Sequence, residues 1–161
     1  EIGIRLSACL MYSFSNFTLG NAEAAQIGFQ KIQETLKTVF SGNESRELQA
    51  GCVFAACMTC ILVHLPTDDL PPLRDYVRYL PAGLRIFAAY LMAHKLYLEG
   101  KYERALGILD AIVISINKPY PIPEIYMNCM ISICRIKNKN LEGAKEAFLT
   151  AWGMAKPDGL L

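Results

Sequence analysis

The same spacing of residues occurs three times along this chain, and it limits the possible folds more than any single residue does. A lead residue is followed five, nine and twelve positions later by small or apolar residues, and a small residue lies seven positions before it. The three sets are Ser13, Gly20, Ala25, Phe29 and Ile32; Ala93, Gly100, Ala105, Leu109 and Ile112; and Ser132, Lys139, Ala144, Phe148 and Ala151. Small residues let two helices cross closely, and apolar residues at helical spacing let the hairpin stack on a copy of itself. The pattern therefore predicts a helical-repeat fold.

The interval between these sets indicates about four repeats. Ala105 and Ala144 are 39 residues apart, and Ala25 and Ala105 are 80 apart, which leaves room for one more repeat near residues 46–80. A period of about 40 residues lies between those of tetratricopeptide and of HEAT or armadillo repeats. The run from Gly100 to Ala105, Gly-Lys-Tyr-Glu-Arg-Ala, favours the tetratricopeptide type. We therefore expect an all-α fold, a tetratricopeptide-like superhelix of about four helix-turn-helix repeats and about eight helices.

Turn, capping and proline residues predict where these helices lie. The expected helices are residues 4–18, 22–40, 44–64, 67–79, 81–99, 102–117, 124–137 and 141–155. Pro71 and Pro72 are compatible only with the first turn of the fourth helix, so the second repeat is the irregular one. Pro119, Pro121 and Pro123 exclude helix between them and set the start of the seventh helix.

Composition favours one compact domain. The chain has 161 residues, of which 53% are hydrophobic and 19% charged, so it can bury a sizeable core and is too apolar to be disordered. A net charge of +1 without clustered Lys and Arg gives no electrostatic basis for binding nucleic acid. The apolar periodic pattern starts almost at Glu1, which is not a methionine. We therefore interpret residues 1–161 as a single helical-repeat domain excised from a larger multidomain protein.

The sequence gives no sign of secretion or of a membrane span. No basic segment precedes an apolar stretch with a small-residue cleavage site. The longest apolar run, Ala50 to Leu65, contains Thr59 and His64 and is shorter than the roughly 20 residues that a bilayer requires. Six cysteines without a secretory signal fit reduced thiols. We expect a cytoplasmic location and no membrane partner.

The repeats, together with the ending Ala-Lys-Pro-Asp-Gly-Leu-Leu at residues 155–161, resemble the helical-repeat region of large LuxR-type, MalT-like transcriptional regulators. The resemblance implies a tetratricopeptide superhelix between a nucleotide-binding module and a carboxy-terminal helix-turn-helix. Neither a Gly-rich Lys-Ser/Thr loop nor a basic recognition helix occurs in this sequence. The resemblance therefore implies a regulatory module that senses an inducer, a peptide or a partner domain of the parent protein, with DNA bound only through a helix-turn-helix absent from this chain.

Three residues could suggest a metal site. Cys57, Cys60 and His64 fall on one face of a helix, with Cys52 nearby, and such a set could supply zinc ligands. No second ligand pair from a separate element follows, and small cysteines buried between repeats explain the same residues. Neither His64 nor His94 has a recognisable nucleophile arrangement around it. We therefore expect that the protein is not an enzyme and that it binds neither a metal ion nor a cofactor.

Aromatic residues on the first helices of the repeats are the candidate binding residues. In a tetratricopeptide array these helices line the concave side, and few Lys, Arg or Asn residues fall on those faces. The predicted groove for a ligand or partner consists of Phe14, Phe17, Phe54, Phe87, Tyr90, His94, Tyr97 and Tyr126. The same spacing also fits rings buried in the core of a narrow superhelix. We expect a signal-sensing or partner-binding module of a transcriptional regulator; the alternative is a free-standing scaffold that assembles a complex and has no role in transcription.

Overall fold

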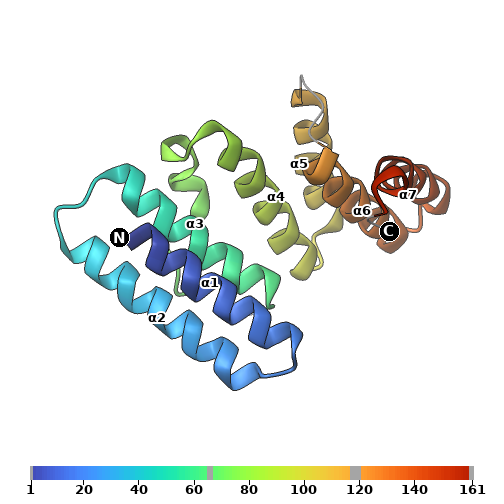
Figure 1. Cartoon of the computed structure of the whole chain (residues 1–161). Helices are drawn as coiled ribbons and strands as arrows, with labels where there is room; N and C mark the ends of the chain where they lie inside the picture. Colours follow the sequence, from blue (N-terminus) through green and yellow to red (C-terminus); the bar gives the residue numbers. More distant parts are fainter. Residues whose placement is uncertain (1, 65–66, 117–120, 160–161) are drawn as a thin grey trace. The chain divides into compact units, whose positions relative to one another are not determined.

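A computed structural model of the chain shows α-helices joined mostly by short turns (Figure 1). It describes residues 2–64, 67–116 and 121–159, and within these ranges there is no β-strand. The helices are α1 (Ile2–Thr18), α2 (Ala22–Ser41), α3 (Arg46–Leu62), α4 (Ala82–Leu98), α5 (Tyr102–Ser115), α6 (Pro121–Lys137) and α7 (Leu141–Ala155), with short 3₁₀ helices η1 (Leu73–Asp75), η2 (Val77–Tyr79) and η3 (Lys156–Asp158). The predicted all-α class is confirmed.

The chain forms two compact units, Glu1–Ala88 and Ala89–Leu161. In the first unit, α1 packs against α2 and α3, α2 packs against α3, and α3 contacts η1 and η2. In the second unit, α6 packs between α5 and α7. The expectation of a single continuous domain stays a prediction.

The apolar run at residues 50–65 falls on α3, which is buried on most of its sides. Its neighbours α1, α2, η1 and η2 cover it, so apolar residues occur around most of the helix rather than along one stripe. Ser45 begins the helix by accepting a hydrogen bond from the backbone N–H of Leu48 at 3.3 Å. Throughout the part of the chain that is described, no helix is both long and apolar enough to span a membrane.

The three helix pairs that carry the repeated spacing turn in the same way. Gly20, Gly100 and Lys139 each have a left-handed backbone, with φ of 79°, 74° and 63°. In each turn the N–H of this residue donates to the carbonyl three residues earlier at 2.9–3.0 Å, and the next N–H donates to the carbonyl five residues earlier at 2.8–2.9 Å. This pair of bonds satisfies carbonyls at the end of the first helix and reverses the chain. The repeated sequence therefore forms a repeated turn.

Small residues behind each turn let the two helices approach closely. Ser132 on α6 donates its hydroxyl to the carbonyl of Ala144 on α7 at 2.8 Å. In the first pair, a Cβ added to Gly28 on α2 would collide with the Ser13 hydroxyl and lie 3.1 Å from the carbonyl of Cys9 on α1. The corresponding alanines of the second set, Ala93 and Ala105, are completely buried as well. The predicted crossing positions are thus buried in all three pairs.

The prediction of a fourth helix at residues 67–79 is wrong. This segment forms η1 and η2 instead, so the described residues contain seven α-helices rather than about eight. Pro71 and Pro72 lack the N–H groups that a helix needs, and the backbone finds other partners. The Arg85 guanidinium donates to the carbonyls of Leu80 at 2.8 Å and Arg78 at 3.0 Å. A side chain of the following helix thus stabilises the irregular segment.

Two other predicted boundaries also need correction. Helix α6 begins at Pro121 rather than at Glu124, because prolines in a first helical turn remove N–H groups that have no intrahelical partner anyway. Pro119 lies outside the described residues. Helix α3 ends at Leu62, and His64 beyond it has a left-handed backbone with φ of 57°.

We expect Lys139→Gly to stabilise the protein by about 1 kcal/mol. A left-handed conformation costs a residue with a side chain about 1–2 kcal/mol, whereas glycine adopts it freely but loses more entropy on folding. Urea denaturation measures the change. Lys137→Gly, in the last turn of α6, is the matched control and should destabilise by about 0.5–1 kcal/mol. Destabilisation by both substitutions would contradict the left-handed turn at Lys139.

We expect Ala105→Leu to destabilise the protein by about 1–3 kcal/mol, because Ala105 is completely buried and a larger side chain overpacks its surroundings. Ala111→Leu makes the same chemical change at an exposed position of the same helix and should alter stability by less than about 0.5 kcal/mol. Thermal and urea melts of the two variants provide the comparison. Equal losses would show that the buried face of α5 is assigned incorrectly.

Candidate functional site

Four aromatic rings form a continuous row in the second unit. Tyr90, His94 and Tyr97 project from α4 at helical spacing, with ring centroids 5.9 Å apart for the first pair and 6.1 Å for the second. Tyr102, the first residue of α5, continues the row, with its ring centroid 5.7 Å from that of Tyr97. The turn at Gly100 makes this last contact possible, because it reverses the chain between the two tyrosines. We call these four residues the aromatic row.

The Tyr90 end of the row is anchored against α6. Burial, followed by proximity to Tyr126, Cys129 and Cys134 of α6, raises the pKa of Tyr90 to about 12. The phenol therefore stays neutral at physiological pH. The ring of Tyr90 therefore packs between α4 and α6 and is also a member of the row.

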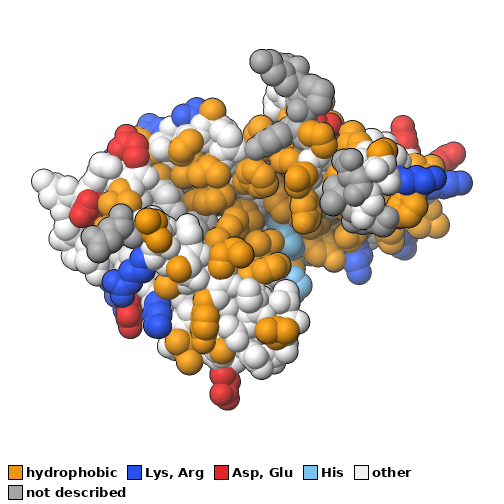
Figure 2. Space-filling view, viewed as in Figure 1, with side chains coloured by type: hydrophobic (Ala, Val, Ile, Leu, Met, Phe, Trp, Pro, Cys, Tyr) orange, Lys and Arg blue, Asp and Glu red, His pale blue; other side chains and the backbone are white. Residues whose placement is uncertain are grey.

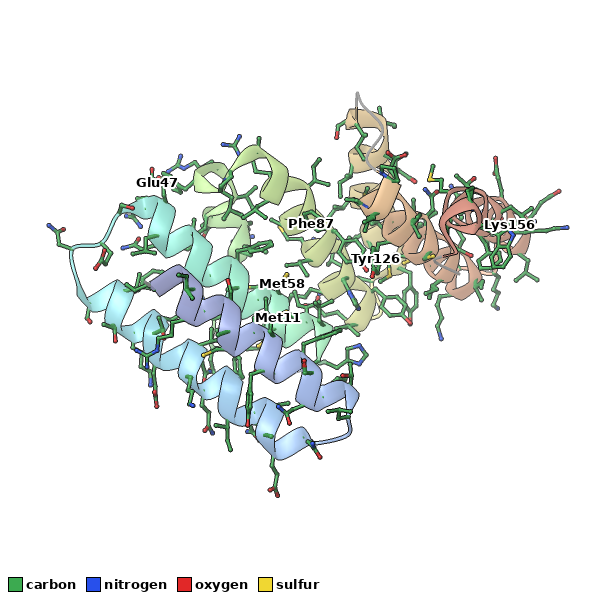
Figure 3. The ribbon with its side chains drawn as sticks, viewed as in Figure 1. Met11, Glu47, Met58, Phe87, Tyr126 and Lys156 are labelled. Atoms are coloured by element: carbon green, nitrogen blue, oxygen red, sulfur yellow. The ribbon has the colours of Figure 1, made fainter. Side chains whose placement is uncertain are left out.

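All four rings of the aromatic row are partly exposed. His94, Tyr97 and Tyr102 are half-buried, and Tyr126 on α6 has 59% of its surface exposed (Figure 3). Half-buried rings keep a fixed orientation through their packed edge and still present a face or edge to solvent. The side chains of the row and of Tyr126 are therefore held in place by their neighbours and can still contact a partner.

Oppositely charged groups lie next to the row, two ammonium groups with one carboxylate. Glu99 accepts a hydrogen bond from the Lys101 ammonium group at 2.7 Å, and the Lys95 ammonium group lies 3.9 Å from the same carboxylate. The bond from Lys101, followed by the proximity of Lys101, Lys95 and Arg104, lowers the pKa of Glu99. This end of the row thus presents tyrosines beside an ion cluster that contains both signs of charge, with an excess of positive groups.

The other four predicted groove residues belong to the first unit. Phe14 and Phe17 are exposed on α1, and Phe87 is half-buried on α4. Phe54 on α3 is only 8% exposed and belongs to the core, so its ring presents almost no surface to a ligand. Hydrophobic side chains reach the surface in both units (Figure 2), and the structure brings Tyr90, His94, Tyr97 and Tyr126 together within the second.

Two features of the surface were not predicted from the sequence. Tyr102 is not among the predicted groove residues, because it lies on the second helix of its hairpin, after the turn. Its position two residues after the turn glycine could have predicted the contact with Tyr97. A pocket of about 490 Å³ also lies in the first unit. Its lining comes from α2 and from the segment before η1: Gln33, Leu36, Lys37, Phe40, Asp69, Leu70 and Pro71. Its volume falls within the range of small-molecule sites.

Four of the six cysteines are buried, and Cys9 and Cys129 are partly exposed. All six are free thiols, and burial followed by the proximity of Cys57 raises the pKa of Cys60 to about 12. Cys57 and Cys60 are buried on α3, whereas His64 follows the end of that helix, so the three residues do not continue one helical face. Within the described ranges, no group of three or more His, Cys, Asp or Glu side chains is placed to hold a metal ion.

We expect the free energy of unfolding to fall as the pH rises from about 9 to 12. Tyr90 and Cys60 both hold their protons more tightly in the folded chain, since their pKa values rise from 10.0 and 9.0 to about 12. Their contribution is complete below pH 9 and disappears as the pH approaches 12, because the unfolded chain releases these protons first. Urea titrations from about pH 8 to 11 follow this loss.

Tyr90→Phe removes the part of this pH dependence that begins near pH 10. Its unfolding free energy should therefore decline less steeply above pH 10 than that of the unmodified chain. Tyr12→Phe, which changes an exposed ring of α1 in the first unit, is the matched control and should leave the slope unchanged. Identical slopes for Tyr90→Phe and the unmodified chain would contradict the buried position of Tyr90.

No protein-family model, curated protein or solved structure matches this chain. The resemblance to LuxR-type regulators therefore stays a prediction, and function has to be argued from the geometry of the surface.

Proposed function

We propose that this chain is a helical-repeat module that binds a protein or peptide partner through the aromatic row and Tyr126. The observation that carries the proposal is the continuous row of half-buried rings, in which Tyr90 lies close to α6 and every ring keeps part of its surface exposed. Tyrosine offers a large apolar face with a polar tip at a small cost in conformational entropy, and it is enriched among residues that dominate binding energy.

The chemistry of the row favours an amphipathic partner. Its rings provide apolar contact, and its hydroxyl and imidazole groups provide hydrogen bonds. Glu99 offsets part of the charge of Lys95 and Lys101, and the small positive excess that remains is too weak to favour a strongly acidic partner. A helix or extended peptide with apolar and uncharged polar side chains fits these properties best.

We further propose that the module belongs to a LuxR-type transcriptional regulator, where it takes an inducer, a peptide or another domain of the same protein on a concave surface. The support for this context is the sequence resemblance, and the repeated hairpin turn is compatible with a tetratricopeptide-like superhelix. The alternative is a free-standing scaffold for complex assembly. A carboxy-terminal helix-turn-helix encoded in the same gene would decide for the regulator.

Binding through the row can be tested with peptides selected against the chain from a random display library. We expect Tyr97→Ala and Tyr126→Ala to raise the Kd of these peptides about tenfold, equivalent to about 1.4 kcal/mol. Fluorescence polarisation with labelled peptides measures the change. Ile114→Ala, which truncates an 82% exposed residue of α5 outside the row, is the control and should leave the Kd unchanged.

The same variants separate binding from folding. Tyr90→Ala should cost about 3–5 kcal/mol of unfolding free energy, because it leaves a cavity against α6. Tyr126→Ala should change stability by less than about 0.5 kcal/mol, since its ring is mostly exposed. Selected peptides that bind Tyr97→Ala and Tyr126→Ala as well as the unmodified chain would argue against the row as the binding surface.

A further inference from the structure

The pocket in the first unit is formed by two parts of the chain. Gln33, Leu36, Lys37 and Phe40 lie at helical spacing on one face of α2. The opposite wall is the segment 69–71, which precedes η1. The described lining residues come from neither α1 nor α7, and both walls belong to the first compact unit. The pocket is therefore an internal feature of this unit.

Contacts outside the pocket hold both walls in place. The ring of Phe40 packs edge-on against that of Tyr76, with centroids 5.8 Å apart and an angle of 78° between the two planes. The backbone N–H of Leu70 donates to the carbonyl of Thr67 at 3.1 Å, which closes a turn before η1. Pro71 lacks the N–H that a helix interior needs, so this segment does not lie on α2 as a regular helix. The space between the walls is therefore formed in advance, and binding costs little entropy of ordering.

The inner part of the pocket is apolar. Leu36 of α2 and Leu70 of the opposite wall are 6% and 8% exposed, so these two side chains form its bottom. Phe40 and Pro71 lie nearer the opening, since both are more exposed. An apolar group that enters this part removes carbon surface of the pocket and of the ligand from water. The inner part therefore fits an aliphatic or aromatic group.

The opening of the pocket carries one charge of each sign, one from each wall. Lys37 of α2 and Asp69 of the segment before η1 are both exposed. Among the described residues, neither side chain takes part in an ion pair or a hydrogen bond, so both groups are available to a ligand. The side-chain amide of Gln33 adds a donor and an acceptor to the lining. A ligand with charge of a single sign would meet one of the two groups as a like charge, whereas a zwitterion complements both.

We propose that this pocket binds a small zwitterion with an apolar side chain, either a free α-amino acid or a dipeptide. The carboxylate of the ligand pairs with Lys37, its ammonium group pairs with Asp69, and its side chain covers Leu36 and Leu70. The pocket volume of about 490 Å³ lies in the lower part of the range for ligand sites, which favours molecules of this size. The site lies in the first unit and shares no residue with the aromatic row in the second.

The first test is an NMR titration of the nitrogen-15-labelled 161-residue chain with leucine, phenylalanine and leucyl-leucine. We expect saturable shift changes in the amides of α2 and of residues 67–71. Glycine carries the same two charges without a side chain and should cause no saturable change. Saturation by the amino acids identifies free amino acids as the ligand, and saturation by leucyl-leucine alone identifies a peptide. No saturable change with any of the three up to about 10 mM would overturn the proposal.

Two variants test the charged groups with the zwitterion that binds. Lys37→Met should raise its Kd about twofold to fivefold, as expected for an exposed ion pair, and should not change the Kd of the ligand's amide, which has no carboxylate. Asp69→Asn should raise the Kd of the zwitterion by a similar factor and should not change that of its N-acetyl derivative, which has no ammonium group.

Matched controls separate these effects from a general change of surface charge. Lys31→Met and Asp68→Asn alter exposed neighbours that do not line the pocket and should leave every Kd unchanged. Thermal melts check that all four variants fold, which their exposed positions favour. An unchanged Kd of the zwitterion in Lys37→Met or in Asp69→Asn, or an equal rise in the two controls, would overturn the proposal.

Discussion

The close crossing of two helices at small side chains is the interaction on which the rest of this structure depends. The left-handed residue after the first helix of each pair reverses the chain, and serine, glycine or alanine behind the turn allows the helix backbones to approach. A larger residue at such a point would separate the pair and shift the faces that meet the neighbouring helices. The turn and the crossing thus determine where both the aromatic row and the packing faces lie.

The aromatic row shows how this geometry produces a surface. The helical spacing of Tyr90, His94 and Tyr97 places them in line, but the reversal at Gly100 is what adds Tyr102 from the next helix. Burial of Tyr90 against α6 fixes one end, so the exposed members do not have to be ordered by a ligand. Preorganised rings lose less entropy on binding than mobile ones.

The sequence predicts the hairpins better than the segments between them. Spacing, glycine turns and buried alanines repeat, and the class and most helix positions follow from them. The turn, capping and proline residues predict a helix at residues 67–79 after α3, but the structure of this segment depends on contacts made by Arg85 from the following helix. Local pattern also could not tell Phe54, covered in the core, from Tyr126, exposed, because burial depends on which helices pack around each ring.

The buried side chains of helix α7 are all small, namely Ala144, Ala147, Ala151 and Ala155, and the partly buried Met154 packs beside them. Alanine permits close approach but removes little apolar surface from water per residue, so this contact contributes less hydrophobic free energy than one made by leucine or phenylalanine. The carbonyls of Ala144 and Gly143 add hydrogen bonds from Ser132 and Arg135. A partner that covers the larger side chains of α7 would therefore shift the local unfolding equilibrium of this helix toward the folded state. The fraction of molecules in which α7 is ordered would then rise with the fraction that has the partner bound.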